Sequence, residues 1–375
     1  MKIQRFYQDL GLFLQPNRVL VIFGPRRVGK TTLLKDFLSV TNLKSKLDSG
    51  DNIKIQHILG SQDFDQIREY ATGYELIAID EAQRIPNVGA GLKIFVDQVP
   101  GIRVIATGSS SFELSGQVGE PLTGRKTTLI LYPIAELELA KHYNRSELRQ
   151  QLSERLVYGA YPEVVTASSH AEKARILEEL VHSYLLKDIL ELERVKGSKI
   201  LLDLLRLIAY QVGNEVSLSE LGSKIGVDTK TVARYLDLFE KSFVLLNLRG
   251  FSRNLRKEVT KKSKYYFYDL GVRNAIISNF NPLDTRDDIG ALWENFCIIE
   301  RLKARAYRNI YANQYFWRTW EHKEVDLIEE REGKLFGYEC KYVGEGGKNK
   351  SAWLNTYPGA SFEVVTSTSY LDFLL

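Results

Sequence analysis

Short apolar runs alternate with helical patterns through the first part of the chain. Runs rich in Ile, Val and Leu predict strands at Arg18–Phe23, Ile53–Ile58, Glu75–Asp80, Ile102–Thr107 and Lys126–Leu131. Apolar residues fall on both faces of these runs, which is typical of strands that are covered by helices on each side. The alternation of strands and helices therefore predicts a parallel α/β sheet.

The pattern changes after about residue 135. Apolar residues three and four positions apart predict helices, for example at Leu201, Leu204, Leu205 and Ile208. A helix–turn–helix pattern follows, and then a second α/β region. We therefore expect four parts: a parallel-sheet α/β domain over 1–135, a helical segment over 136–212, a winged helix–turn–helix over 213–265 and a C-terminal α/β domain over 266–375.

The composition excludes several classes of protein. Of the 375 residues, 44% are hydrophobic and 26% are charged, which rules out a mainly disordered chain. The longest apolar runs are strand-sized and the first residues lack the apolar stretch of a signal peptide, so we expect a cytoplasmic protein without membrane contact. The two cysteines, Cys297 and Cys340, and five scattered histidines exclude a disulfide framework and a cysteine-rich zinc site.

A glycine-rich loop follows the first predicted strand and fits the phosphate-loop pattern G-x-x-x-x-G-K-[ST]. In such a loop the backbone N–H groups point at phosphate oxygens, at the positive end of the following helix. Lys30 is expected to reach the β- and γ-phosphates, and Thr31 to offer its hydroxyl to Mg²⁺. The predicted nucleotide-binding residues are Gly24, Pro25, Arg26, Arg27, Val28, Gly29, Lys30, Thr31 and Thr32.

Two further predicted strands end in residues that suit the same site. One ends in Asp80 and Glu81, where the aspartate suits the Mg²⁺ shell and the glutamate can act as general base. The next ends in small hydroxyl residues, so Ser109, or Thr107, is expected to sense the γ-phosphate by hydrogen bonding.

This order of elements resembles the AAA-like P-loop ATPases of bacteria and archaea that carry an Asp-Glu-x-Gln Walker B segment, here Asp80 to Gln83. The segments LTGRKTTLILYPIAELE, 122–138, and GAYPEVV, 159–165, are also similar to that family. The resemblance implies ATP and Mg²⁺ as cofactors. It also implies a γ-phosphate or trans-acting role for Arg125, with a solvated arginine in a turn as the alternative.

Positive charge is concentrated in one part of the chain. The formal net charge is +4, but residues 213–265 alone hold 11 Lys or Arg and 6 Asp or Glu. In the helix–turn–helix pattern, Gly226 ends the first helix and Asp228 or Thr229 caps the second. The residues predicted to face outward on the second helix, where a recognition helix meets DNA, are Lys230, Thr231, Arg234 and Tyr235. A winged helix that serves only as a hinge is the alternative.

The C-terminal part contains a predicted hairpin with its turn at Glu332-Gly333. This turn places Asp326 opposite Glu339 and Glu324 opposite Lys341. Two directly opposed carboxylates are destabilising, and a bridging Mg²⁺ is the simplest compensation. Lys341 would then stabilise the charge of a phosphate under attack.

This pattern resembles the PD-(D/E)XK nuclease core, with Glu294 as the helical glutamate that completes the predicted metal set of Glu294, Asp326 and Glu339. The sequence therefore predicts an ATPase that acts on DNA, or is regulated by it, through a winged helix and a nuclease-like domain. Two alternatives stay open: an ATP-dependent switch that binds a protein partner through a degenerate scaffold, and an ATP-gated nuclease. Association with further copies of the chain is also open.

Overall fold

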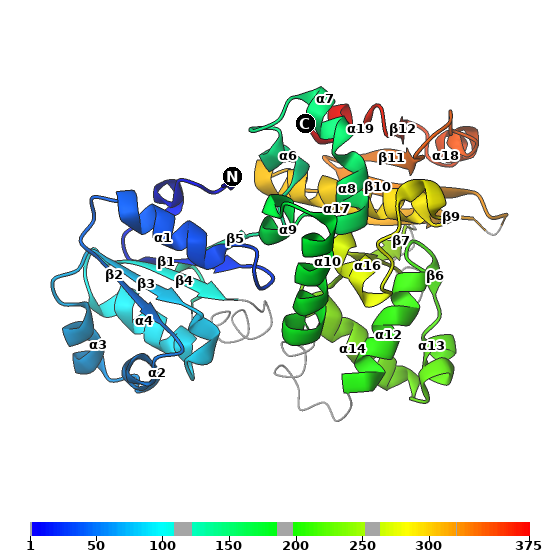
Figure 1. Ribbon diagram of the computed structural model, residues 1–375. Coiled ribbons are helices and arrows are strands. Elements are labelled where there is room, and N and C mark those ends of the chain that lie inside the picture. The colour runs from blue at the N-terminus through cyan, green and yellow to red at the C-terminus, as the bar shows by residue number, and fades with distance from the viewer. Residues whose placement is uncertain (1, 109–121, 186–197, 252–262, 320) are drawn as a thin grey trace.

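The computed structural model describes residues 2–108, 122–185, 198–251, 263–319 and 321–375. Figure 1 shows two lobes, an N-terminal sheet with its helices and a larger lobe that holds the rest of the chain. Within these described ranges, no helix combines the length and the apolar character needed to cross a membrane.

The N-terminal lobe is built on a five-stranded parallel sheet of order β2-β3-β4-β1-β5. Its strands are β1 (Arg18–Phe23), β2 (Ser45–Ser49), β3 (Leu76–Asp80), β4 (Arg103–Gly108) and β5 (Lys126–Ile130). Alternate residues of β1 enter two different cores: Leu20 and Ile22 pack with α1 (Lys30–Val40), whereas Val19 and Val21 pack on the opposite face. The helices of that face are α2 (Ile53–Gly60), α3 (Phe64–Ala71) and α4 (Val88–Gln98). The predicted parallel sheet, covered on both faces, is confirmed.

One predicted strand is wrong. Ile53–Ile58 lies within helix α2, which begins after Asn52, whose side chain accepts a hydrogen bond from the backbone of Lys54. The buried residues of α2 are Ile55 and Leu59, four positions apart, so the apolar period is helical. The corresponding strand of the sheet is β2, which lies at its edge. Its residues are mostly polar, so the hydrophobic pattern does not predict it.

The second lobe combines helices with a seven-stranded sheet of order β12-β11-β10-β9-β7-β8-β6. Its strands are β6 (Glu215–Val216), β7 (Leu245–Gly250), β8 (Ser263–Phe267), β9 (Asn313–Arg318), β10 (Glu324–Arg331), β11 (Lys334–Cys340) and β12 (Ser361–Val365). Its α-helices are α6 (Glu136–Leu139), α7 (Arg145–Gln150), α8 (Leu152–Tyr158), α9 (Pro162–Thr166), α10 (His170–Glu179), α12 (Ser198–Tyr210), α13 (Leu218–Ile225), α14 (Thr229–Lys241), α16 (Leu270–Ile276), α17 (Ile289–Arg308), α18 (Lys350–Thr356) and α19 (Tyr370–Leu374).

The seven-stranded sheet joins two segments that the sequence separates. Strand β7, which follows the helix–turn–helix, pairs with β8 on one side and with β9 of the C-terminal segment on the other. The expected boundary between 265 and 266 falls inside β8. A fragment that starts after β8 would therefore lose part of its own sheet.

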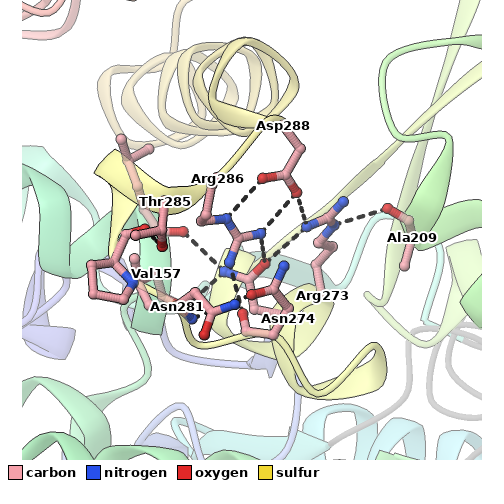
Figure 2. Close-up of polar contacts among 11 residues, drawn as sticks. Val157, Ala209, Arg273, Asn274, Asn281, Thr285, Arg286 and Asp288 are labelled. Carbon is pink, nitrogen blue, oxygen red and sulfur yellow. Dashed lines mark hydrogen bonds and ion pairs between the residues drawn. The ribbon is translucent and has the colours of Figure 1, made fainter.

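A polar cluster ties the helical segment to the start of α17 (Figure 2). Asp288 lies between two guanidinium groups, 2.5 Å from Nη1 of Arg273 and 2.7 Å from Nε of Arg286. Arg273, which is buried, also donates to the carbonyl of Ala209 in α12, and Asn274 donates to two carbonyls of α8. Burial by itself raises the pKa of Asp288, but hydrogen bonds from Arg286 and the charge of Arg273 hold this pKa below its ordinary value.

We predict that Asp288→Asn lowers the free energy of unfolding by about 3 kcal/mol at pH 7, because Arg273 becomes a buried charge without its partner. A carboxylate whose pKa is lowered on folding stabilises the fold above its unfolded pKa, and this contribution disappears as the pH falls through the folded pKa. The difference between wild type and variant should therefore shrink below about pH 4. Thermal unfolding at pH 7 and pH 3 measures it, with the exposed Asp287→Asn as control. An equal loss at both pH values would contradict the assignment.

Candidate functional site

The glycine-rich loop joins the end of β1 to the start of α1 at the carboxyl edge of the parallel sheet. At Gly24, a Cβ atom would collide with the backbone carbonyl of Leu131, and Gly29, the cap of α1, has a left-handed φ of +94°. Both positions therefore require glycine. Lys30 begins α1, is buried, and donates from its ammonium to the carbonyls of Gly24 and Pro25 at 2.9 and 2.7 Å.

Asp80 is the centre of the polar contacts next to this loop. The hydroxyl of Thr31 donates to one carboxylate oxygen of Asp80 at 2.7 Å, and the hydroxyl of Thr107 donates to the other. Glu81 follows in a left-handed conformation with φ +50°, and its backbone N–H donates to Asp80 at 3.2 Å. The side chain of Gln83 donates to the Glu81 carboxylate at 2.5 Å. The structure therefore brings the ends of β1, β3 and β4 together at one edge.

The two candidate γ-phosphate sensors are Ser109 and Thr107. Ser109 lies outside the described residues. Thr107 is fully buried and its hydroxyl is bonded to Asp80, so in this structure it orients that carboxylate. Sequence reasoning found the position of Thr107 but not this contact.

Arg27 of the loop is directed to the second lobe. It adopts φ +60° and forms ion pairs with Glu163 of α9 at 3.2 Å and Glu179 of α10 at 2.9 Å. Thr32, in the first turn of α1, is exposed. Arg27, which the sequence predicts only as a nucleotide-binding residue, thus connects the loop to α9 and α10. The sequence pattern does not indicate these two contacts.

Arg125 lies at the opposite edge of the sheet from the loop. It directly precedes β5, whose first residue, Lys126, pairs with Val19 at the start of β1, whereas the loop follows Phe23. That separation amounts to about 13 Å along the strands. The Arg125 side chain forms an ion pair with Asp97 of α4 at 2.7 Å. Arg125 therefore does not contact the loop of its own chain, because β5 begins directly after Arg125 and runs toward the loop, which leaves Arg125 at the far end of the strand.

Arg5 is a residue of the site that motif reasoning missed. It is buried behind the loop, where its guanidinium donates to the carbonyl of Val28 and, at 2.6 Å, to the carbonyl of Tyr132. Its Nε donates at 2.9 Å to the carboxylate of Glu138 in α6, and the Glu138 side chain is fully buried. Its Nη2 lies 3.4 Å from the hydroxyl of Tyr307 in α17. Burial alone lowers the pKa of Arg5, but the charge of Glu138 raises it overall, so Arg5 stays protonated.

A large groove of about 1420 Å³ opens beside the loop. Its lining includes the N-terminal segment, Gly29 of the loop, helix α1 with Thr32, and helix α9 with Pro162 and Thr166. Arg5 also lines it. The groove therefore adjoins the loop, and its volume exceeds the roughly 300–1,000 Å³ of a typical small-molecule pocket, so it is large enough for a nucleoside.

The two helices of the helix–turn–helix are α13 and α14, and the turn between them is as predicted. Gly226 follows α13 in a left-handed conformation, and the side chain of Asp228 caps α14. Lys230 and Arg234 are exposed one turn apart. Tyr235 is buried, at 4% exposure, which corrects its expected outward position: it lies on the apolar side of α14, one position from Leu236.

In the rest of the basic segment, 213–265, acidic side chains neutralise part of the positive charge. Lys224 and Lys241 form ion pairs on their own helices, with Glu220 and Asp237, and the hydroxyl of Thr231 donates to Asp228. Five further basic residues lie outside the described residues: Arg253, Arg256, Lys257, Lys261 and Lys262.

The four C-terminal candidates line one polar cavity of about 250 Å³: Glu294, Asp326, Glu339 and Lys341. The predicted hairpin register is confirmed from Leu327–Tyr338 to Arg331–Lys334. At Asp326 the ladder is replaced by a side-chain contact, because its carboxylate accepts the backbone N–H of Cys340 at 2.7 Å. Burial, reinforced by the charge of Glu294, raises the pKa of Asp326 to about 8.

These carboxylates do not form the expected metal site. Throughout the described parts of the chain, no group of three or more His, Cys, Asp or Glu side chains is arranged to hold a metal ion. Instead the ammonium of Lys264, from β8, forms ion pairs with Glu294 at 3.2 Å and with Glu324. Motif reasoning missed Lys264, and the only signal for it is a lysine in front of the aromatic run of β8.

Three family models match separate parts of the chain. Residues 16–140 match a family model described as an AAA domain. Residues 149–283 and 289–356 match two models described as domains of unknown function, DUF8612 and DUF4143.

Similar proteins occur in distant organisms. The uncharacterized protein Rv2008c of Mycobacterium tuberculosis is 28% identical over 331 residues, which are 86% of this chain and 70% of that protein. An uncharacterized protein of Haemophilus influenzae is 27% identical over 296 residues and 73% of each chain. Among solved structures, the Walker-type ATPase PABY2304 of Pyrococcus abyssi has a TM-score of 0.45 at 16% identity, covering 69% of this chain and 91% of that one.

The parallel sheet, the loop after β1 and the family match lead to the same conclusion. The N-terminal part of this chain has the fold of an AAA-type P-loop ATPase.

Proposed function

We propose that this chain binds ATP with Mg²⁺ and hydrolyses it. The observation that carries the proposal is the 2.7 Å contact between Thr31 of the loop and Asp80 after β3. A hydroxyl and a carboxylate next to a loop of backbone N–H groups are the donor set that P-loop ATPases use for Mg²⁺ and phosphate. The residues present therefore fit Mg²⁺–ATP, with Thr31 and Asp80 as the groups that would hold the metal.

Each residue of the site has a task in this proposal. The loop binds the phosphates, Lys30 turns from its own loop carbonyls to the β- and γ-phosphates, and the adjoining groove receives the nucleoside. Glu81 takes a proton from the attacking water, with its carboxylate oriented by Gln83. Mg²⁺ supplies neutralisation of the charge that develops on the phosphates.

We further propose that Arg5 positions the loop. Its guanidinium donates to the loop at the backbone carbonyl of Val28, so it acts on the loop through the backbone. Because Glu138 holds the same guanidinium, the loop is connected to α6 in the second lobe. A change in the loop on ATP binding or hydrolysis would then also move α6 in the second lobe.

DNA is the partner that we propose for the second lobe. The support is the pair Lys230 and Arg234, exposed one turn apart in the first half of α14, after a capped turn of helix–turn–helix geometry. A protein partner is the alternative, since the basic segment is partly neutralised by its own acids. For Arg125, we propose the trans-acting role only, which requires a second copy of the chain.

We predict that Lys30→Ala abolishes ATP binding, because it removes the cation that is proposed to meet the β- and γ-phosphates. Glu81→Gln should still bind ATP but hydrolyse it roughly 100-fold more slowly, because only the base is removed. Binding is measured by fluorescence of a labelled nucleotide and turnover by phosphate release. The exposed Lys35→Ala and Glu69→Gln are matched controls. Normal turnover in the Glu81 variant would take that residue out of the base role.

We predict that Arg5→Met costs about 3–5 kcal/mol of unfolding free energy, because Glu138 is left as a buried unpaired charge. The double variant Arg5→Met/Glu138→Gln should recover most of that stability. It should still bind ATP about tenfold more weakly, because the loop has lost a charged hydrogen-bond donor. If the double variant binds ATP like wild type, Arg5 supports the fold and does not position the loop.

We predict that reversing Lys230 and Arg234 to Glu weakens DNA binding and lowers the slope of log affinity against log salt by about 1–2, because phosphate contacts are lost. Fluorescence anisotropy with labelled duplex DNA over a salt series measures both. The control reverses Lys35 and Lys93, two exposed lysines of the N-terminal lobe, which changes the net charge equally. An equal loss in the control would favour the hinge role of the helix–turn–helix.

A further inference from the structure

The C-terminal cavity differs from a nuclease metal centre in the partners of its acidic side chains. Four carboxylates line it, from Glu294, Glu324, Asp326 and Glu339. A divalent metal would need oxygen lone pairs from several of them at once. In this chain these carboxylates accept hydrogen bonds or ion pairs from groups of the protein itself.

Lys264 is the donor shared by two of these acids. Its side chain is 2% exposed, and its ammonium lies 3.2 Å from Glu294 and in contact with Glu324. The same Glu294 oxygen accepts the hydroxyl of Tyr266 at 2.6 Å. Burial alone lowers the pKa of Lys264, but Glu294 and Glu324 raise it above its ordinary value, so the ammonium stays charged.

The other two acids are satisfied by the C-terminal segment. Asp326 accepts the backbone N–H of Cys340. Glu339 accepts the backbone N–H of Gly347 at 2.8 Å and lies 3.5 Å from the ammonium of Lys341. Arg318 adds a further cation 3.8 Å from Glu324. The cavity thus contains three cationic side chains against four acidic side chains, which leaves little excess charge to attract a metal ion.

We propose that Lys264 takes the place of a divalent cation in this cavity, so that the nuclease-like residues form a neutralised, metal-free cluster. The ammonium holds β8 against α17 and β10, which joins the helix–turn–helix part of the sheet to the C-terminal part. The proposal is independent of ATP hydrolysis. It removes the ATP-gated nuclease from the alternatives, because the metal on which such a nuclease depends is excluded.

Isothermal titration calorimetry with Mn²⁺ tests the proposal on the full chain without nucleotide. We expect wild type and Asp326→Asn to give the same heats up to millimolar Mn²⁺, since the cavity takes no metal. Lys264→Met should melt roughly 5–10 °C lower, because it leaves the partly buried carboxylates of Glu294 and Glu324 without their cation. It should then bind Mn²⁺, and Mn²⁺ should raise its melting temperature by mass action.

Two further variants make the outcome decisive. In Lys264→Met/Asp326→Asn the new Mn²⁺ binding should weaken at least tenfold, whereas Lys264→Arg keeps the charge and should bind no metal. Mn²⁺ binding by wild type that is lost in Asp326→Asn would overturn the proposal, as would a folded Lys264→Met that binds none. If Lys264→Met does not fold, the wild-type titration still decides, because metal binding there contradicts the proposal and its absence supports it.

Discussion

The arrangement of the two lobes depends on one buried charge, the guanidinium of Arg5. A buried cation must be paired and hydrogen-bonded, since its desolvation otherwise costs several kcal/mol. Its acceptors come from both lobes: the loop carbonyl of Val28, the carbonyl of Tyr132 after β5, and the carboxylate of Glu138 in α6. The loop and α6 can therefore move apart only if this charge loses its partners. This energetic cost holds the phosphate loop to the second lobe.

Helix α17 connects this interface with the C-terminal cavity. Tyr307, near its end, stacks on Phe6 beside Arg5, with ring centroids 4.8 Å apart. In its middle, Glu300 accepts the backbone N–H of Glu136 at 2.7 Å. Glu294, near its start, pairs with Lys264. These contacts span about 20 Å of a single rigid helix. Both charged clusters therefore rest on one element, and a shift of this helix would change both together.

The parts of this structure that the sequence predicts are those in which local pattern and local backbone decide the result. The strands with apolar residues on both faces are found, and so is the phosphate loop, because its glycines are required by its own backbone. The hairpin register follows from its turn. The failures also have local causes. The run Ile53–Ile58 is too short to distinguish the two-residue period of a strand from the 3.6-residue period of a helix. Tyr235 follows an exposed arginine, but the buried side of α14 is broad enough to include it.

The chemistry of the second half of the chain could not be read in the same way, because its deciding contacts join segments far apart. Asp…Glu-x-Lys specifies which carboxylates meet on the hairpin, but not which cation neutralises them. That cation comes from Lys264, 60 residues before Glu324, and a lysine ahead of aromatic residues gives no sign of its partner. Arg125 is a second example of a position that the sequence could not predict. The motif marks this arginine as a candidate, but the direction of strand β5 determines its distance from the loop. A phosphate loop can be recognised from its sequence because its own backbone forms the site, whereas a carboxylate cluster acquires its function from the charge that the rest of the fold places beside it.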